Sequence, residues 1–307
     1  ALYASVIGER VTGFVLDGSG LADDVRKFRT SLAGRRRDAE ALGVALHRRL
    51  IAPIAAELTG KRLMIVPHGV LHYIPFAALG DGKSALIDRY SLRTLPSASV
   101  ARYLRKGSGQ APDRLLAFGN PDLGNAELDL PGAEREARAL ASSVPQSRLL
   151  VRREASRVAF RELAPGFRFI HVAAHGEFEE KTPLSSRLYF AKVGADDGEL
   201  SAGDVYGVEL DADLVTLSAC ETGLGEVMTG DEVVGLMRGF LYAGASSVVG
   251  SLWKVSDVST TTLMLRFYEN LKRMPKDDAL REAQLAVRNV QPHPFYWAAF
   301  YLTGDGR

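Results

Sequence analysis

Residues 214–232 read LVTLSACETGLGEVMTGDE, and the character of this stretch changes at its middle. Its first half is apolar and contains β-branched residues, a pattern that predicts a buried strand. The strand ends at Cys220, the only cysteine among 307 residues, and a polar, glycine-rich segment follows directly. A lone cysteine in an apolar strand is usually a small buried hydrophobe, but loops that follow strands often carry catalytic groups. Packing and chemistry therefore both remain open as roles for this thiol.

Strand and helix patterns alternate on both sides of this stretch. The patterns predict helices at residues 131–144 and 231–244, and strands at residues 114–120, 167–176, 246–253 and 296–302. Near-continuous apolar strands that alternate with helices are typical of a parallel sheet buried on both faces. We therefore expect an α/β fold whose mostly parallel sheet is covered by helices on both faces.

The first third of the chain has a different pattern. Residues 3–20 predict two strands around a Gly-Glu turn, and residues 38–58 repeat apolar side chains at helical spacing. The stretch KGSGQAP, residues 106–112, is the most linker-like in the sequence. We therefore expect a smaller subdomain at residues 1–106 and the main α/β domain at residues 107–307.

Composition excludes several classes of protein. The net charge of +1 gives no electrostatic reason to expect contact with nucleic acid or with an anionic membrane surface. No apolar run approaches the roughly 20 residues that span a bilayer, and the chain does not open with a signal peptide. A single cysteine cannot form an internal disulfide, which fits a reducing compartment. We expect a cytoplasmic protein, and a start without methionine predicts that an upstream part is missing.

Two reactive side chains fall at the ends of predicted strands, His175 and Cys220. The carboxyl ends of parallel strands meet at one edge of a sheet, so neighbouring strands would place imidazole and thiol side by side. An imidazole can take the proton of a thiol, whose pKa is ordinarily about 8.5. Gly176 allows close backbone approach, and its N–H and that of Cys220 are candidate donors to an oxyanion. The polar residues 177–201 are expected to form a solvated loop beside this site.

Other chemistries fit the sequence less well. His171 and His175 are spaced like a metal pair on a helix, but their apolar, β-branched surroundings favour a strand, and the glutamate of H-E-x-x-H is missing. We therefore expect His171 to be a packed core histidine. No G-x-S-x-G motif for a serine hydrolase and no G-x-G-x-x-G motif for a dinucleotide occurs. The stretch GDGKS at residues 80–84 is not a phosphate loop, because Ala77 stands at its first glycine position.

Several motifs in order along the chain resemble the CHAT-domain proteases, caspase-like cysteine peptidases commonly fused to tetratricopeptide repeats. The motifs are IVPHGVLHYIPFAAL (65–79), GNPDL (119–123), LPGAEREARAL (130–140), HVAAHGEF (171–178), LVTLSACETGLGE (214–226), GLMRGFLYAGASSVVGSLWKVSD (235–257) and PFYWAAFYLTG (294–304). The resemblance covers nearly the whole chain. The stretch GSLWKVSD is also similar to a segment of the separase protease domain.

The resemblance implies a caspase–haemoglobinase fold with a Cys-His dyad and no metal or organic cofactor. It makes Cys220 the nucleophile, His175 the general acid and base, and the N–H groups of Gly176 and Cys220 the oxyanion hole. Residues up to about Lys106 would form a non-catalytic caspase-like subdomain. Tetratricopeptide repeats or a regulatory partner would belong upstream of Ala1. Two classes stay open: a cysteine endopeptidase acting on a protein substrate, and a catalytically silent docking or scaffold domain.

The residue before the scissile bond is expected to be basic. A caspase-like site selects this residue in a pocket beside the nucleophile, and a buried charge there needs an opposite charge. Three acids fall on strand-end loops expected near the pocket: Asp257, the first choice, Asp122, the second, and Asp231. Lys254 stands close by, where separase has an acidic residue, and would neutralise one of them. The alternative roles are structural, with Asp257 capping a helix and Asp122 ordering a turn.

Overall fold

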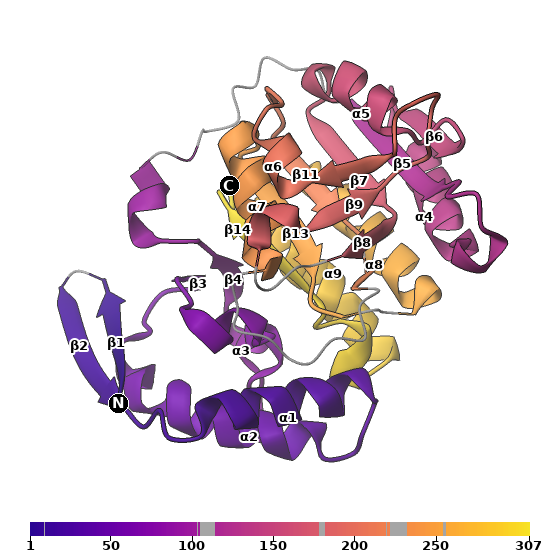
Figure 1. Ribbon diagram of the computed structural model, residues 1–307. Helices are drawn as coiled ribbons and strands as arrows, with labels where there is room; N and C mark the ends of the chain where they lie inside the picture. Colours follow the sequence, from indigo (N-terminus) through magenta and orange to yellow (C-terminus); the bar gives the residue numbers. More distant parts are fainter. Residues whose placement is uncertain are drawn as a thin grey trace.

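A computed structural model describes residues 1–8, 10–102, 104, 114–177, 182–218, 220–221, 232–253 and 256–307. Its centre is an eight-stranded sheet. Figure 1 labels its strands. The strands, in order across the sheet, are β3 (Arg62–Ile65), β4 (Ser91–Thr94), β14 (Phe300–Gly304), β13 (Ser247–Ser251), β11 (Leu214–Leu217), β7 (Phe169–Ala173), β5 (Leu115–Pro121) and β6 (Arg148–Arg152). Among the neighbouring pairs of this sheet, β13–β14 is antiparallel and the others are parallel. The expected mostly parallel sheet is confirmed.

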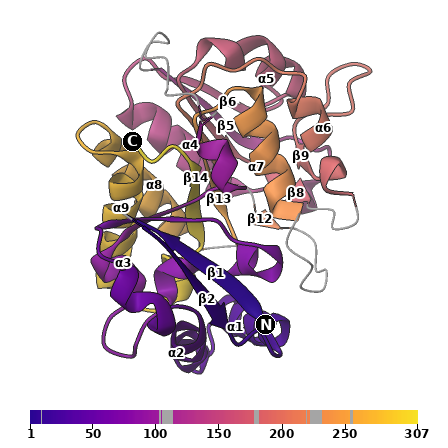
Figure 2. The same ribbon diagram turned by 90° about the vertical axis from the view of Figure 1, so that its left-hand side faces the viewer.

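Helices cover both faces of this sheet (Figure 2). The helices are α1 (Leu21–Ala33), α2 (Ala39–Leu50), α3 (Leu86–Arg89), α4 (Pro131–Ser143), α5 (Arg157–Leu163), α6 (Ala202–Val205), α7 (Glu232–Ala243), α8 (Asp257–Leu271) and α9 (Lys276–Val290), and those from α4 onward pack on the two faces. Successive side chains of a strand point to opposite faces. On β5, Leu115 and Ala117 therefore pack in one core with α4, α8 and α9, while Leu116 and Phe118 pack in a second core with α5, α6 and α7.

A second, four-stranded sheet stands at the carboxyl edge of the large one. Its order is β10 (Glu199–Ser201), β9 (Arg187–Tyr189), β8 (His175–Glu177) and β12 (Cys220–Glu221). Strand β8 follows β7 along the chain, and β12 follows β11. Strand β7 pairs with β11 and β8 pairs with β12, both in parallel. The strands that lead to His175 and Cys220 are therefore adjacent and parallel. The expectation of a solvated loop over residues 177–201 is wrong in part, because β9 and β10 form there and bury Leu188 and Leu200.

The N-terminal third also joins the large sheet. An antiparallel hairpin, β1 (Leu2–Ile7) and β2 (Val11–Leu16), opens the chain as expected, and helices α1 and α2 follow it. Strand β4 then pairs with β14, from the opposite end of the sequence, through Thr94 and Thr303. The boundary predicted at Lys106 lies outside the described residues, and the division into 1–106 and 107–307 stays a prediction. In the part of the chain that is described, no helix is both long and apolar enough to cross a membrane.

Candidate active site

The two candidate catalytic residues are register partners on neighbouring strands. In the pair β8–β12, the Cα of His175 lies opposite that of Cys220, and Gly176 lies opposite Glu221. Neighbouring strands of a sheet are about 4.8 Å apart. Strands β8 and β12 continue β7 and β11, which are buried on both faces of the large sheet. The fold therefore brings the backbones of the two residues together, as their positions at strand ends predict.

The imidazole of His175 is held by a backbone carbonyl. Its Nε2 lies 2.7 Å from the carbonyl oxygen of Leu128, on the short 3₁₀ helix Ala126–Leu128. A carbonyl oxygen only accepts hydrogen bonds, so Nε2 carries the proton in this contact. In the neutral ring, Nδ1 is then the nitrogen with a free lone pair. The contact thus fixes both the orientation of the ring and the nitrogen that can act as a base.

Asn120 orders the loop that supplies this carbonyl. It is buried at the end of β5, with a backbone φ of 49°, a left-handed conformation that asparagine tolerates better than most residues. Its Oδ1 accepts the N–H of Leu130 at 2.7 Å, and its Nδ2 donates to Glu134 at 3.3 Å. The start of α4 and the segment that contains Leu128 are therefore tied to the end of β5.

A cavity of about 180 Å³ lies beside His175. It opens between the N-termini of α4 and α8 and the carboxyl ends of β7, β11 and β13, the edge at which α/β sheets bind ligands. Its lining includes three acids. The residues that line it are Asp129, Leu130, Pro131, Gly132, Ala133, Glu136, Ala174, His175, Ser218, Ser251, Asp257, Thr260 and Phe300.

Asp257, the first choice for the substrate contact, lines this cavity as the first residue of α8. Its carboxylate lies directly over the start of α4, because a Cβ placed on Gly132 would fall 2.0 Å from the Cγ of Asp257. The positive ends of two helices therefore face this carboxylate. Among the described residues, Arg135 is the cation that contacts it, with Nη2 at 3.5 Å from Oδ2 and both side chains more than half exposed.

Of the other two predicted acids, the structure describes only Asp122. Asp122 does not line the cavity beside His175. Its Oδ1 accepts the N–H of Gly124 at 3.0 Å, and its Oδ2 accepts from Nε of Arg153 at 3.3 Å. The Gly124 amide first, and then the Arg153 guanidinium, lower the pKa of Asp122 below its ordinary value. This is the turn-ordering role that the sequence left open. Asp231 and Lys254 lie outside the described residues.

A buried polar chain stands behind the cavity. As expected, His171 is a core histidine, with no exposed surface. Its Nε2 lies 2.9 Å from Oε1 of Glu136, and its Nδ1 lies 3.4 Å from the hydroxyl of Tyr268, which donates to Thr216 at 3.1 Å. Burial raises the pKa of Tyr268 above its ordinary value. The described residues contain no group of three or more His, Cys, Asp or Glu that is placed to bind a metal ion.

Sequence reasoning missed Glu136, although one signal pointed to it. Gly132, Glu136 and Leu140 are spaced by four, so the helix places them on one face, and all three are buried in α4. An acid on the apolar face of a helix is unusual because a buried carboxylate needs compensating partners. The spacing within the motif LPGAEREARAL therefore indicates that Glu136 is buried.

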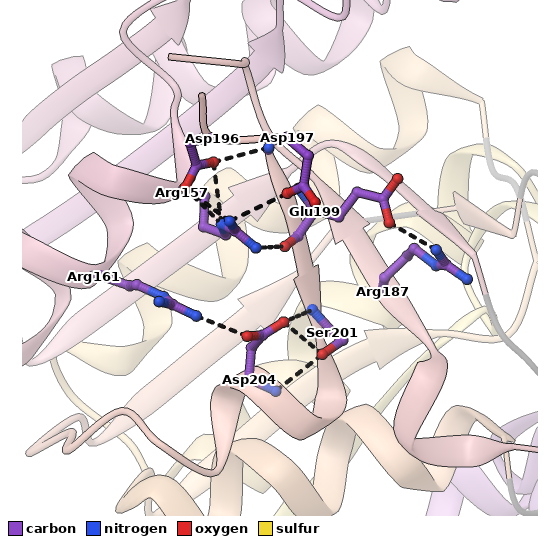
Figure 3. Close-up of polar contacts among 9 residues, drawn as sticks. Arg157, Arg161, Arg187, Asp196, Asp197, Glu199, Ser201 and Asp204 are labelled. Carbon is purple, nitrogen blue, oxygen red and sulfur yellow. Dashed lines mark hydrogen bonds and ion pairs between the residues drawn. The ribbon is translucent and has the colours of Figure 1, made fainter. Parts of the chain in front are cut away.

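Ion pairs fix the sheet that carries His175 (Figure 3). Arg157 binds Asp196 through Nε at 3.0 Å and Nη2 at 2.8 Å, and it also donates to the carbonyl of Glu199. Arg187 on β9 binds Glu199 on β10 at 2.7 Å. Burial, and then a hydrogen bond to Glu177 of β8, raise the pKa of Tyr189 to about 12. The outer strands β9 and β10 are therefore anchored, and β8 pairs with β9.

Comparison with known proteins finds relatives in sequence. A family model described as CHAT domain matches residues 40–305. The Homo sapiens protein "Tetratricopeptide repeat protein 28" is 28% identical over 321 residues, which cover 85% of this chain and 13% of that protein, and its Mus musculus counterpart matches to the same extent. The chain thus spans 13% of the length of these curated relatives.

Solved structures of proteases also resemble the chain. The Saccharomyces cerevisiae separase–securin complex matches with a TM-score of 0.52 and 15% identity, over 78% of this chain and 15% of that one. The Arg-specific cysteine proteinase gingipain R matches with a TM-score of 0.49 and 10% identity, over 93% of this chain and 74% of that one.

Proposed function

This chain belongs to the CHAT-domain family, and from that membership we propose that it is a cysteine endopeptidase that hydrolyses peptide bonds in a protein partner. The observation that carries the proposal is the pairing of Cys220 with His175 on neighbouring parallel strands. The ends of neighbouring parallel strands meet at one edge of a sheet, which supports a thiol and an imidazole acting there as a nucleophile and its base.

In the proposed mechanism, Nδ1 of His175 takes the proton of the Cys220 thiol, and the thiolate attacks the carbonyl carbon of the scissile peptide bond. The N–H groups of Gly176 and Cys220 stabilise the oxyanion that forms. The imidazolium then protonates the leaving amine, the C–N bond breaks, and a thioester remains. His175 next removes a proton from water, which attacks the thioester and releases the carboxylic acid and the thiol. The Leu128 carbonyl supports these steps because it keeps Nε2 as the protonated nitrogen.

We also propose that the enzyme cleaves after arginine or lysine. Asp257 supports this specificity because its carboxylate lines the cavity beside His175. A buried cation of a substrate is stabilised by a carboxylate, whereas an acidic side chain would meet a like charge. Asp122 is the weaker candidate, since Arg153 and the amide of Gly124 already bind it.

Tetratricopeptide repeats are the expected route to protein partners. The curated relatives are named for tetratricopeptide repeats and are much longer than this chain. We propose that such repeats accompany the protease domain in the longer protein and present the protein substrate to it.

A peptide library with a fluorogenic leaving group tests the proposal. We expect the wild type to cleave after basic residues and Cys220→Ala to abolish cleavage, because the thiolate is the nucleophile. His175→Ala should lower kcat by orders of magnitude, whereas the control His68→Ala, at an exposed histidine, should leave it unchanged. Iodoacetamide should label Cys220 and inactivate the enzyme.

Two results would contradict the proposal. Cleavage by folded Cys220→Ala at the wild-type rate would eliminate the cysteine as nucleophile. A folded wild type that cleaves no peptide and whose Cys220 does not react with iodoacetamide would favour the alternative, a catalytically silent docking or scaffold domain.

A further inference from the structure

Glu136 is a buried carboxylate without a lysine or arginine partner among the described residues. It belongs to α4, is 4% exposed and contributes to the lining of the cavity beside His175. The other two acids of the cavity do have such partners, Asp129 with Arg152 at 2.5 Å and Asp257 with Arg135 at 3.5 Å. Burial of an uncompensated carboxylate is costly, so Glu136 must hold its place through specific hydrogen bonds.

One of these bonds determines what Ser218 offers to the cavity. The hydroxyl of Ser218 donates to Oε2 of Glu136 at 3.1 Å. A serine hydroxyl has one proton and two lone pairs, and a carboxylate can only accept. The single proton of Ser218 is therefore committed to Glu136. Because Ser218 also lines the cavity, its oxygen has only lone pairs left to offer a ligand there.

The other oxygen of Glu136 has a close contact and no hydrogen bond among the described residues. Oε1 lies 2.9 Å from Nε2 of His171 outside hydrogen-bond geometry, and His171 in turn contacts the Tyr268 hydroxyl. Facing a carboxylate, Nε2 is expected to carry a hydrogen, since a bare nitrogen would be repelled. The carboxyl group thus lies between His171 and Ser218 and is hydrogen-bonded to Ser218. The orientation of Ser218 follows from this arrangement whether His171 is neutral or charged.

We propose that Glu136 makes this cavity a site for a guanidinium or ammonium group by turning the Ser218 hydroxyl into a hydrogen-bond acceptor. Ser218 and Asp257 then present acceptors to the residue that precedes the scissile bond. Arginine and lysine carry donors only at their ends, so both are matched by such a cavity. Glu136 acts through Ser218 and is a positioning residue. The substrate class rests on the proposed endopeptidase function, which this inference deepens.

The test compares a charged ligand with its neutral isostere. N-acetyl-arginine methylamide and N-acetyl-citrulline methylamide differ by replacement of one terminal NH2 group of the charged guanidinium with a carbonyl oxygen, an acceptor, in a neutral side chain. Binding of each is measured by calorimetry on the Cys220→Ala background, so that no turnover is needed. We expect the arginine ligand to bind about 10- to 100-fold more tightly, since hydrogen bonds to charged groups are worth about twice neutral ones.

Two variants on that background separate the roles. In Glu136→Gln the side-chain amide can donate to Ser218, which frees the hydroxyl proton to point into the cavity. The arginine-to-citrulline ratio should fall about tenfold, and Ser218→Ala should lower it similarly. The control Glu162→Gln, at an exposed acid on α5, should leave the ratio unchanged. A loss of fold would weaken both ligands together, whereas the ratio reports the polarity of the cavity. Ser218→Ala keeps the test valid if Glu136→Gln does not fold.

The binding measurements test this inference independently of whether the protein cleaves peptides. Equal binding of the two ligands to the parent overturns it, even if wild-type enzyme cleaves other peptides. A ratio that survives in both Glu136→Gln and Ser218→Ala also overturns it. Preference in the parent that is lost in the folded variants supports it, even if wild-type enzyme cleaves nothing.

Discussion

Gly132 leaves room for the acid that is proposed to recognise the substrate. A Cβ at this position would lie 2.0 Å from both Cγ and Oδ2 of Asp257, so Gly132→Ala must displace that carboxylate. Alanine is also the better helix former, by up to about 1 kcal/mol. We therefore predict that Gly132→Ala lowers the preference for arginine over leucine in kcat/KM several-fold without lowering the melting temperature.

Assays of two peptides, one with arginine and one with leucine directly before the scissile bond, check the selectivity. Thermal unfolding checks the melting temperature. Gly166→Ala is the matched control, because nothing lies within 4 Å of the Cβ that it adds. Unchanged selectivity in a folded Gly132→Ala protein would remove Asp257 from the recognition of substrate.

At this scale the sequence predicts some residues and not others. Cys220 and His175 can be predicted as neighbours because each follows an apolar strand, and the ends of parallel strands meet at one edge. The carbonyl of Leu128 and the hydroxyl of Ser218 cannot be predicted, since their roles depend on hydrogen bonds between segments far apart in the chain. The position of Asp122 on a strand-end loop does not predict its role, because the N–H of Gly124 and the side chain of Arg153 already bind it.

At the scale of elements, Arg157 joins α5 to the outer strands of the small sheet. Its side chain and that of Asp196 are about four-fifths buried, and the pair is bidentate. We predict that Arg157→Met lowers the free energy of unfolding by about 1–3 kcal/mol, because it removes charge-assisted hydrogen bonds from partly buried groups. It should also lower kcat, since β9 pairs with β8. Urea denaturation at pH 7 measures the first effect and peptide turnover the second.

The same pair has a predictable pH dependence. The Arg157 guanidinium, first, and the amide of Gly198 lower the pKa of Asp196 below its ordinary value of 3.8. A lowered pKa in the folded state means that the stabilisation is present above the unfolded pKa and is lost as the pH falls through the folded one. The difference between wild type and Arg157→Met should therefore shrink below about pH 4.

A surface pair gives the control for this prediction. Arg153 is 92% exposed in its ion pair with Asp122, and exposed pairs contribute little. Arg153→Met should therefore change the free energy of unfolding by less than about 1 kcal/mol, both at pH 7 and below about pH 4. An equal loss of stability in the two variants would show that burial of Arg157 does not matter.

Long apolar elements are predictable from the sequence, and short ones are not. The strands at β5, β7, β11 and β13 follow from continuous apolar runs, which a sheet buried on both faces requires. Strands β9 and β10 have three residues each, too few to show a period, and polar residues surround them. They are strands because Leu188 and Leu200 are buried in the second core, a consequence of tertiary packing.

At the scale of the whole molecule, segments from both ends of the chain build one core. Buried side chains of α1 and α2 belong to the same hydrophobic cluster as those of α8 and α9. Strand β4 adds to the large sheet through β14. Polar contacts cross the same interface, with Ser91 and Arg62 bound to Asp278, and Arg281 donating to the carbonyl of Ile87.

We therefore predict that residues 1–307 unfold in one cooperative transition. Separation of the first 106 residues would expose the edge of β14 and an apolar face of α8 and α9 to water, a cost that scales with the area uncovered. Calorimetry should give a van't Hoff enthalpy equal to the calorimetric one, and fluorescence and circular dichroism should report the same midpoint in urea. The fragment 107–307 should bind a hydrophobic dye and lack a cooperative transition. Two resolved transitions, or a fragment that folds and unfolds cooperatively, would instead make the predicted subdomains independent folding units.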